Sequence, residues 1–153
     1  MDGKKLIQEY LKNARVMHLA TSVNDKPWVC NVHFYADDEN NLYWISTPTR
    51  RHSEEIAKNP NVAVTIKVHE DTPKEPYVIG LSLEGKAELL SEEETKEIGP
   101  KYIAKLGNIP TLAEDILSGK NPHKFYRLRP TNIVLFDTKS FPDNPRQEYK
   151  IGG

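Results

Sequence analysis

The sequence predicts a mainly β fold, namely a six-stranded antiparallel β-barrel with α-helices inserted between some of its strands. Three observations support this fold class. Six segments have the length and apolar pattern of strands, several neighbouring strands are joined by short turn-like segments, and helical patterns are few. A doubly wound parallel sheet needs a helix between most strands. The order of helix, three strands, helix, two strands, helices and strand therefore favours an antiparallel barrel.

The first half of the chain is predicted to contain two helices and three strands. Leu6, Ile7 and Leu11 recur at helical spacing near the start of the chain. Pro60 disfavours helical geometry in the residue before it, so the second helix is expected to end near Lys58. The predicted elements are a helix over 4–13, strands over 16–22, 28–35 and 42–47, and a helix from 49 or 50 to 58.

The second half is predicted to contain three longer strands with a helical block before the last one. Gly85 is expected to mark a bulge or bend, and Pro130 a bulge or an edge position. Ser91 and Glu94 have the spacing of a capping box, whereas Gly99-Pro100 is expected to interrupt the helix that follows. The predicted elements are strands over 62–68, 78–90 and 125–137 and helical pieces over 91–106 and 110–117.

The length and composition indicate one domain followed by a tail. Residues 1–137 are expected to form the domain, because no linker-like segment or internal repeat divides them. Residues 138–153 are polar and contain two prolines. We expect this tail to dock on the domain or on a partner subunit.

Charge and residue usage exclude several classes of protein. The net charge of −1 provides no global basic field for nucleic acid. The single cysteine excludes an internal disulfide, and neither a Cys cluster nor a His-x-His pattern predicts a metal site. No apolar run has the length of a membrane span, and the first residues lack the apolar core of a signal peptide. We therefore expect a cytoplasmic protein that acts on a small molecule.

The segment from Thr47 to His52 is electrostatically unusual. It lies where a predicted strand runs into a predicted helix, and it places Arg50, Arg51 and His52 at the helix start. Cations are disfavoured there, because the first helical turn carries partial positive charge. A bound anion would reverse this cost, and free N–H groups at a helix start bind phosphate well. The alternative is a solvated helix start in which these cations pair with the acidic residues that follow.

Several short motifs occur in an order that resembles one known family. They are Asp25-Lys26-Pro27, Leu42 to Thr47, Arg50-Arg51-His52, Asn59 to Ala63, Leu83 to Ala87 and Arg127 to Pro130. This order resembles the pyridoxamine 5′-phosphate oxidase-like proteins, whose domain is an FMN-binding split barrel. The resemblance covers roughly residues 5–137. It implies a homodimer that holds FMN in clefts at the subunit interface.

The resemblance also implies roles for the residues of the basic turn. Ser46 matches the hydroxyl residue that contacts the flavin phosphate, and Arg51 matches the arginine at the helix start. Thr47 would supply a further hydroxyl. His52 stands where many members have lysine, so phosphate binding is expected to weaken as the pH rises above roughly 6.5. Arg50 could compensate for the lost charge.

Three residues of the second strand match the place where the family's chain passes the flavin ring. These are Cys30, Asn31 and Val32, of which Asn31 can both donate and accept at the pyrimidine edge. The oxidase proper has an arginine at the place of Cys30 and further substrate-binding groups in its C-terminal part. Neither feature has a match here. The resemblance thus implies a flavin cofactor but argues against oxidation of pyridoxamine phosphate.

The expected activity is redox chemistry on a bound FMN. Hydride or electrons would pass between the flavin and a small substrate or a nicotinamide nucleotide, with the protein supplying orientation and electrostatics. No general acid or base can be identified. The alternative is a non-catalytic cofactor-binding or redox-sensing module, because the same fold class includes proteins that bind haem or deazaflavin. Trp28 and Trp44 are expected to pack in the core or at a dimer interface.

Overall fold

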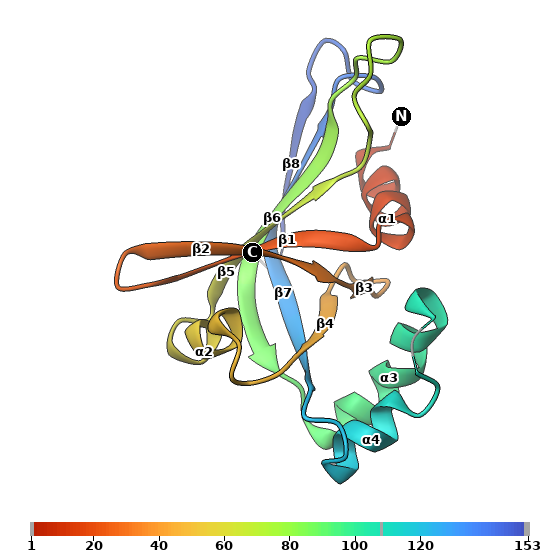
Figure 1. Ribbon diagram of the computed structural model, residues 1–153. Helices are drawn as coiled ribbons and strands as arrows, with labels where there is room; N and C mark the ends of the chain where they lie inside the picture. The colour runs from red at the N-terminus through yellow and green to blue at the C-terminus, as the bar shows by residue number, and fades with distance from the viewer. Residues whose placement is uncertain (1, 108, 152–153) are drawn as a thin grey trace.

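The computed structural model describes residues 2–107 and 109–151, which form one antiparallel sheet and four helices (Figure 1). The first part of the chain contains α1 (Gly3–Asn13), β1 (Val16–Val23), β2 (Lys26–His33), β3 (Tyr35–Ala36), β4 (Leu42–Ser46) and α2 (Arg51–Lys58). The second part contains β5 (Asn61–Lys67), β6 (Ile79–Leu89), α3 (Glu92–Leu106), α4 (Leu112–Ser118), β7 (Lys124–Asp137) and β8 (Arg146–Lys150).

The strand order explains how the sheet curls into a split barrel. The order is β2-β1-β5-β6-β7-β4-β3, with β8 paired to β7 outside this path. The segment after β2 changes partner near Phe34: His33 pairs with Val16 on β1, whereas Tyr35 pairs with Tyr43 on β4. One continuous stretch of chain therefore connects the two ends of the sheet. The mainly β split-barrel fold expected from the sequence is confirmed.

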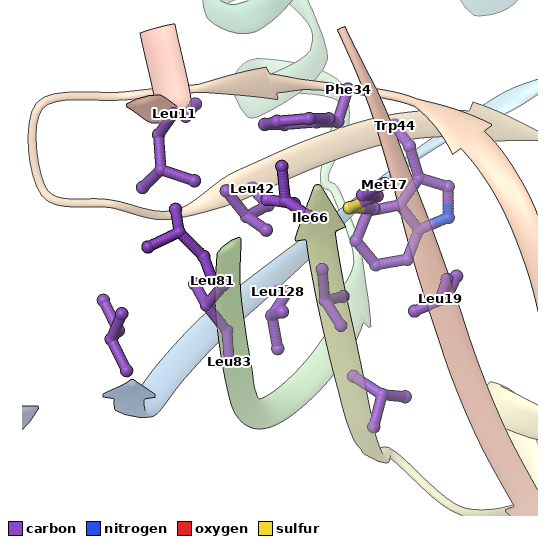
Figure 2. Packing of buried hydrophobic residues seen from close by; sticks show 14 of the residues in the cluster. Leu11, Met17, Leu19, Phe34, Leu42, Trp44, Ile66, Leu81, Leu83 and Leu128 are labelled. Carbon is purple, nitrogen blue, oxygen red and sulfur yellow. The ribbon is translucent and has the colours of Figure 1, made fainter. Parts of the chain in front are cut away.

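The barrel interior is filled by apolar side chains from the alternating strands. In β5 every second residue is buried, as the alternation of its valines predicted. Figure 2 shows side chains from α1 and from several strands meeting in this core, with Trp44 beside Met17. A second apolar cluster joins α3 and α4 to the outer side of β4 and β7, where Tyr102 meets Phe125 edge to face at 5.3 Å. The helical block is thereby anchored to the sheet.

The predicted irregularity at Gly85 is confirmed, and the structure gives its cause. The register between β6 and β7 shifts between Glu84 and Gly85, opposite Pro130. A Cβ atom at Gly85 would lie 2.1 Å from the carbonyl oxygen of Arg129. Proline cannot donate to the ladder at this point, so the two backbones approach in a bulge that only glycine fits.

The predicted interruption of the third helix is wrong. α3 is continuous through Gly99 and Pro100, although the proline lacks the N–H that would bond to the preceding turn. Buried residues lie on both sides of the proline, including Ile98 and Tyr102, and they pack in the same cluster as α4. This tertiary packing outweighs the loss of one helical hydrogen bond. The capping box of Ser91 and Glu94 is present as predicted.

The strand count also differs from the prediction, because the sheet has eight strands and not six. One additional strand is the short β3, which the sequence pattern merges with β2. The other is β8 in the tail, which pairs with β7 from Asn132 opposite Lys150 to Phe136 opposite Arg146. β8 consists almost entirely of polar residues without an apolar alternation, so its sequence carries little strand signal. Figure 1 shows β8 beside the C-terminal half of β7.

Candidate functional site

The helix α2 begins without a side-chain cap. Arg50 is the N-cap residue, and its guanidinium has no acceptor atom that could cap a backbone N–H group. The first helical bond runs from the Glu54 N–H to the Arg50 carbonyl at 3.0 Å. The N–H groups of Arg51, His52 and Ser53 therefore have no acceptor in the described part of the chain. Such unpaired N–H groups, together with the helix dipole, attract an anion.

Two buried hydroxyls hold the helix start against the end of β4. Ser53 Oγ donates to Ser46 Oγ at 2.9 Å, and both residues are buried. The Ser46 hydroxyl in turn points to the carbonyl of Thr47 at 3.3 Å. The Thr47 hydroxyl accepts from Thr49 at 3.4 Å. Ser46 thus lies at the predicted place, but its hydroxyl is already engaged in positioning the turn.

Arg51 is held on two sides. Its Nε donates to Glu55 Oε2 at 3.1 Å, and Glu55 also accepts from the Thr21 hydroxyl at 2.6 Å. The guanidinium carbon lies 4.1 Å from the ring centroid of Trp28 on β2. The hydrogen bond from Thr21, and then that from Arg51, lower the pKa of the Glu55 carboxyl. Within the described residues, the two terminal nitrogens of Arg51 have no hydrogen-bond partner.

His52 is half-buried in the same turn. Its Nε2 atom is inaccessible to solvent and has no hydrogen-bond partner in the part of the chain that the structure describes. Burial, and then the positive charge of Arg50, lower the pKa of the imidazole from its ordinary value of 6.5. The ring is therefore mainly neutral at neutral pH. A buried polar atom without a partner is costly, and a hydrogen-bonding ligand would remove that cost.

The predicted ring-contacting residues of β2 lie on opposite faces of the strand. Cys30 and Val32 are half-buried and pack against the barrel core, whereas Asn31 is exposed on the outer face. Burial raises the pKa of the Cys30 thiol, which makes it a poor nucleophile. Trp28 has the same parity as Cys30 and lies next to α2 through Arg51. The structure thus brings the phosphate candidates to one face of β2 and leaves Asn31 on the other.

The outer face of the sheet contains the larger of two relevant cavities, with a volume of about 490 Å³. Six strands line it, and small or apolar side chains such as Val29, Ala63, Ser82 and Val134 lie there beside charged ones from β6 and β8. Val29 alternates with Trp28 along β2, so this cavity and the basic turn lie on either side of the same strand. The cavity is partly open to solvent.

A smaller apolar cavity of about 290 Å³ adjoins α2. Pro48 and Ser53 from the basic turn line it together with Ile56, Tyr126 and Lys124. It lacks the cluster of cations that distinguishes the solvent side of the turn.

The combined arrangement can bind an anionic group but provides no evident acid–base pair. The unpaired amides and the free edge of Arg51 can donate hydrogen bonds to a phosphate, and the orphaned His52 nitrogen lies in the same turn. In the described residues, no group of three or more His, Cys, Asp or Glu side chains could hold a metal ion. Sequence reasoning missed the contact of Trp28 with Arg51, because the two residues lie on different elements. The pairing of Arg51 with Glu55 follows the i,i+4 spacing that the sequence already displays.

The comparison with known families decides the relationship of this chain. A family model described as pyridoxamine 5′-phosphate oxidase matches residues 4–136. The chain belongs to this family. The matched region includes the basic turn, the strand β2 and the bulge at Gly85, but not β8. No curated protein sequence shows a significant match.

Solved structures support the fold at low sequence identity. A heme binding protein from Mycobacterium smegmatis superposes with a TM-score of 0.77 at 12% identity, over 98% of this chain and 58% of that chain. General Stress Protein 26 from Bacillus anthracis gives a TM-score of 0.69 at 18% identity, over 99% and 100% of the two chains. A NimC/NimA family protein from Clostridium acetobutylicum gives 0.66 at 18% identity, over 99% and 95%. Among the described helices of the present chain, none is sufficiently long and apolar to span a bilayer.

Proposed function

We propose that this member of the pyridoxamine 5′-phosphate oxidase family is a homodimeric FMN-binding oxidoreductase that acts on a small substrate. The observation that carries the proposal is the start of α2. Within the described residues, three backbone N–H groups, the terminal guanidinium nitrogens of Arg51 and one imidazole nitrogen lack a hydrogen-bond partner there, all within one helical turn. The backbone N–H groups and the guanidinium are hydrogen-bond donors, so a phosphate satisfies them together, and the buried His52 nitrogen can join them when it carries a proton.

Charge supports phosphate over a neutral ligand. Arg50 and Arg51 lie at the positive end of the helix dipole, where Glu54 stands in the first turn and Glu55 pairs with Arg51. Arg51 uses Nε for Glu55, which leaves its two terminal nitrogens for a bidentate contact. Ser46 and Ser53 hold the turn in place from below. Thr47 is the remaining hydroxyl that could contact the phosphate directly.

The position of the flavin ring is proposed from the strand that passes the turn. Asn31 faces the outer side of β2, where its amide is exposed, while Cys30 and Val32 form the inner side. The open cavity on that outer face has a floor of small residues such as Ala63 and Ser82. Because β2 ends the sheet path, a flavin whose phosphate lies at the basic turn would reach this face around the edge of β2. A second subunit placed on this face would then cover the cavity and complete a cleft for the ring. The exposed Val29, at 58% of its full accessibility, supports an apolar partner surface here.

When bound, FMN would supply the hydride or electron chemistry, and NADH or NADPH is the proposed source of reducing equivalents. The residues of this chain bind and orient the cofactor. Arg50, Arg51 and the helix amides hold the negative charge, and His52 donates or accepts a hydrogen bond according to its protonation. The raised pKa of the half-buried Cys30 thiol argues against a covalent role for it.

The decisive experiment is a visible spectrum of the purified protein followed by titration with FMN. We expect the purified protein to show the visible absorption bands of the isoalloxazine ring. If it is purified without flavin, we expect saturable quenching of the fluorescence of added FMN at micromolar concentration. Incubation with NADH or NADPH and an acceptor then distinguishes an oxidoreductase from a redox-sensing module that binds flavin without turnover. A colourless protein that leaves FMN unbound at high micromolar concentration would contradict the proposal.

Haem is the alternative cofactor, and one structural neighbour favours testing it. The Mycobacterium smegmatis protein with this fold is described as heme binding. A deazaflavin cofactor should be tested in the same titration, because it also carries a phosphate. A Soret band after addition of haem, without binding of FMN, would support the haem alternative. The mass of any ligand released on denaturation identifies a cofactor that is purified with the protein.

A further inference from the structure

Trp28 and Arg51 form a contact that the family relationship does not assign to any role. They lie on β2 and α2, and the guanidinium carbon of Arg51 is 4.1 Å from the centroid of the Trp28 ring. This distance is that of a stacked cation–π pair. The indole is 42% exposed, which is unusual for so large an apolar side chain in a globular domain. An exposed tryptophan beneath an arginine therefore calls for a role outside the core.

The contact restricts the orientation of the Arg51 side chain. Arginine has several rotatable bonds, and fixing them on ligand binding costs conformational entropy. Here the indole supports one face of the guanidinium, and Glu55 holds its Nε edge at 3.1 Å. Glu55 is itself fixed by the Thr21 hydroxyl at 2.6 Å. The only edge of the guanidinium without a partner in the described chain is the pair of terminal nitrogens.

We propose that Trp28 is a positioning residue, which together with Glu55 pre-orients Arg51 so that its terminal nitrogens meet a phosphate group at the start of α2. This inference rests on the proposed FMN function and adds a specificity determinant to it. Trp28 acts through Arg51 and makes no contact with the phosphate. Its effect is therefore confined to ligands that carry a phosphate. A tryptophan that stacks on the flavin ring would instead affect every flavin equally.

The comparison of FMN with riboflavin separates these roles, because the two ligands share the ring and differ in the phosphate. We expect Trp28→Leu to lower the ratio of FMN affinity to riboflavin affinity by about 2- to 5-fold, the range of an exposed cation–π contact. Trp28→Phe keeps an aromatic face and should restore most of the ratio. Riboflavin affinity should stay within about 2-fold of the wild-type value in both variants.

A double-mutant cycle tests the physical contact without any flavin. The free energy of unfolding is measured for Trp28→Leu, Arg51→Met and the double variant, with Lys58→Met as the matched control. Lys58 lies in the last turn of the same helix, so its replacement removes one charge without removing the stacked contact of Arg51. We expect non-additivity for Trp28 with Arg51 and additivity for Trp28 with Lys58.

The outcomes distinguish failure of this inference from failure of the proposed function. Wild-type protein that binds neither flavin contradicts the proposed function and this inference with it. Wild-type protein that binds FMN, combined with an unchanged FMN-to-riboflavin ratio in Trp28→Leu, overturns only the role of Trp28. Equal losses for both ligands assign Trp28 to the ring and also overturn it. Additivity of Trp28 and Arg51 removes the contact on which the inference depends.

Discussion

At the scale of single residues, Arg51 and His52 differ in how many of their hydrogen-bonding groups already have a partner in the protein. Arg51 has an acidic partner, an aromatic support and one free edge. His52 has a buried nitrogen without a partner and a lowered pKa. A phosphate adds bonds to the first residue and relieves a cost at the second. The two residues should therefore contribute to binding with different dependence on pH.

Replacement of Arg51 by alanine should weaken FMN binding by about 1.5–3 kcal/mol, because a charge-assisted hydrogen bond is lost. Fluorescence titration of FMN measures the effect. Lys58→Ala removes a charge from the other end of α2 and should leave the affinity nearly unchanged. Equal affinities of the Arg51 variant and the wild type would remove Arg51 from the site.

His52 should make FMN binding depend on pH. In the free protein its pKa is lowered from 6.5, and a neighbouring phosphate would raise it because it favours the imidazolium. FMN binding is then coupled to proton uptake, so the His52 contribution grows as pH falls between these two pKa values and is lost as pH rises above them.

The measurement compares wild type with His52→Gln from about pH 5 to about pH 8, because the phosphate of FMN titrates in the same range. The ratio of the two affinities should increase toward acid pH. His52→Lys carries a permanent charge and should bind FMN more tightly than wild type at about pH 8. A ratio that is constant with pH would show that His52 stays neutral beside the phosphate.

At the scale of elements, close helix packing explains why α3 is continuous. Gly99 faces α4, and a Cβ atom there would lie 2.5 Å from the Cβ of Ala113. The buried face of α3 continues past Pro100 to Tyr102 and Leu106. The helix is therefore held by its contacts with α4 and the sheet, despite its proline.

Gly99→Ala should accordingly destabilise the protein, although alanine is the better helix former. We expect a loss of about 1–3 kcal/mol in the free energy of unfolding, because the added methyl group forces α3 and α4 apart. Pro100→Ala is the control on the same helix, since it restores a backbone N–H at an exposed position and should raise stability. Urea denaturation followed by circular dichroism compares them. A Gly99→Ala variant as stable as wild type would contradict this account of the packing.

At the scale of the whole molecule, the outer sheet face is the surface most suited to a second copy of the chain. Its cavity of about 490 Å³ has a floor of small residues, and exposed apolar side chains such as Val29 and Phe136 lie on the same face. The proposed flavin ring would contact this face through Asn31. Dimer formation and cofactor affinity should therefore be coupled.

A charge placed in the centre of this face should abolish the proposed dimer. Ala63 is exposed on β5 and pairs with Glu84 on β6, so Ala63→Lys places a lysine opposite an acid and keeps the monomer folded. Light scattering after size exclusion should give a monomer, and FMN affinity should fall about 10-fold or more if the partner completes the cleft. The control is Asn61→Lys, because Asn61 lies on the same strand but does not line the cavity; this variant should remain dimeric. A dimeric Ala63→Lys variant with normal FMN affinity would exclude this face.

Local sequence patterns were enough to predict most helices and strands of this protein and the cluster of cations at the basic turn. Alternation along β5 and the capping box at Ser91 depend only on neighbouring residues, and Gly85 marks the bulge in its own strand; each is present in the structure. The cluster of cations at the start of α2 likewise follows from the positions of these residues in the sequence. Whether a phosphate occupies that turn stays a prediction.

Only the tertiary structure decided how distant segments combine. Trp28 and Arg51 meet because β2 and α2 both pack beside β1, a relation that no local pattern encodes. β8 forms because β7 offers it an edge, and α3 continues through Pro100 because α4 covers its buried face. Short-range propensity is worth fractions of a kcal/mol per residue, whereas burial against another element contributes more. The sequence therefore determined the elements and the charge of the turn, while packing decided which side chains surround Arg51.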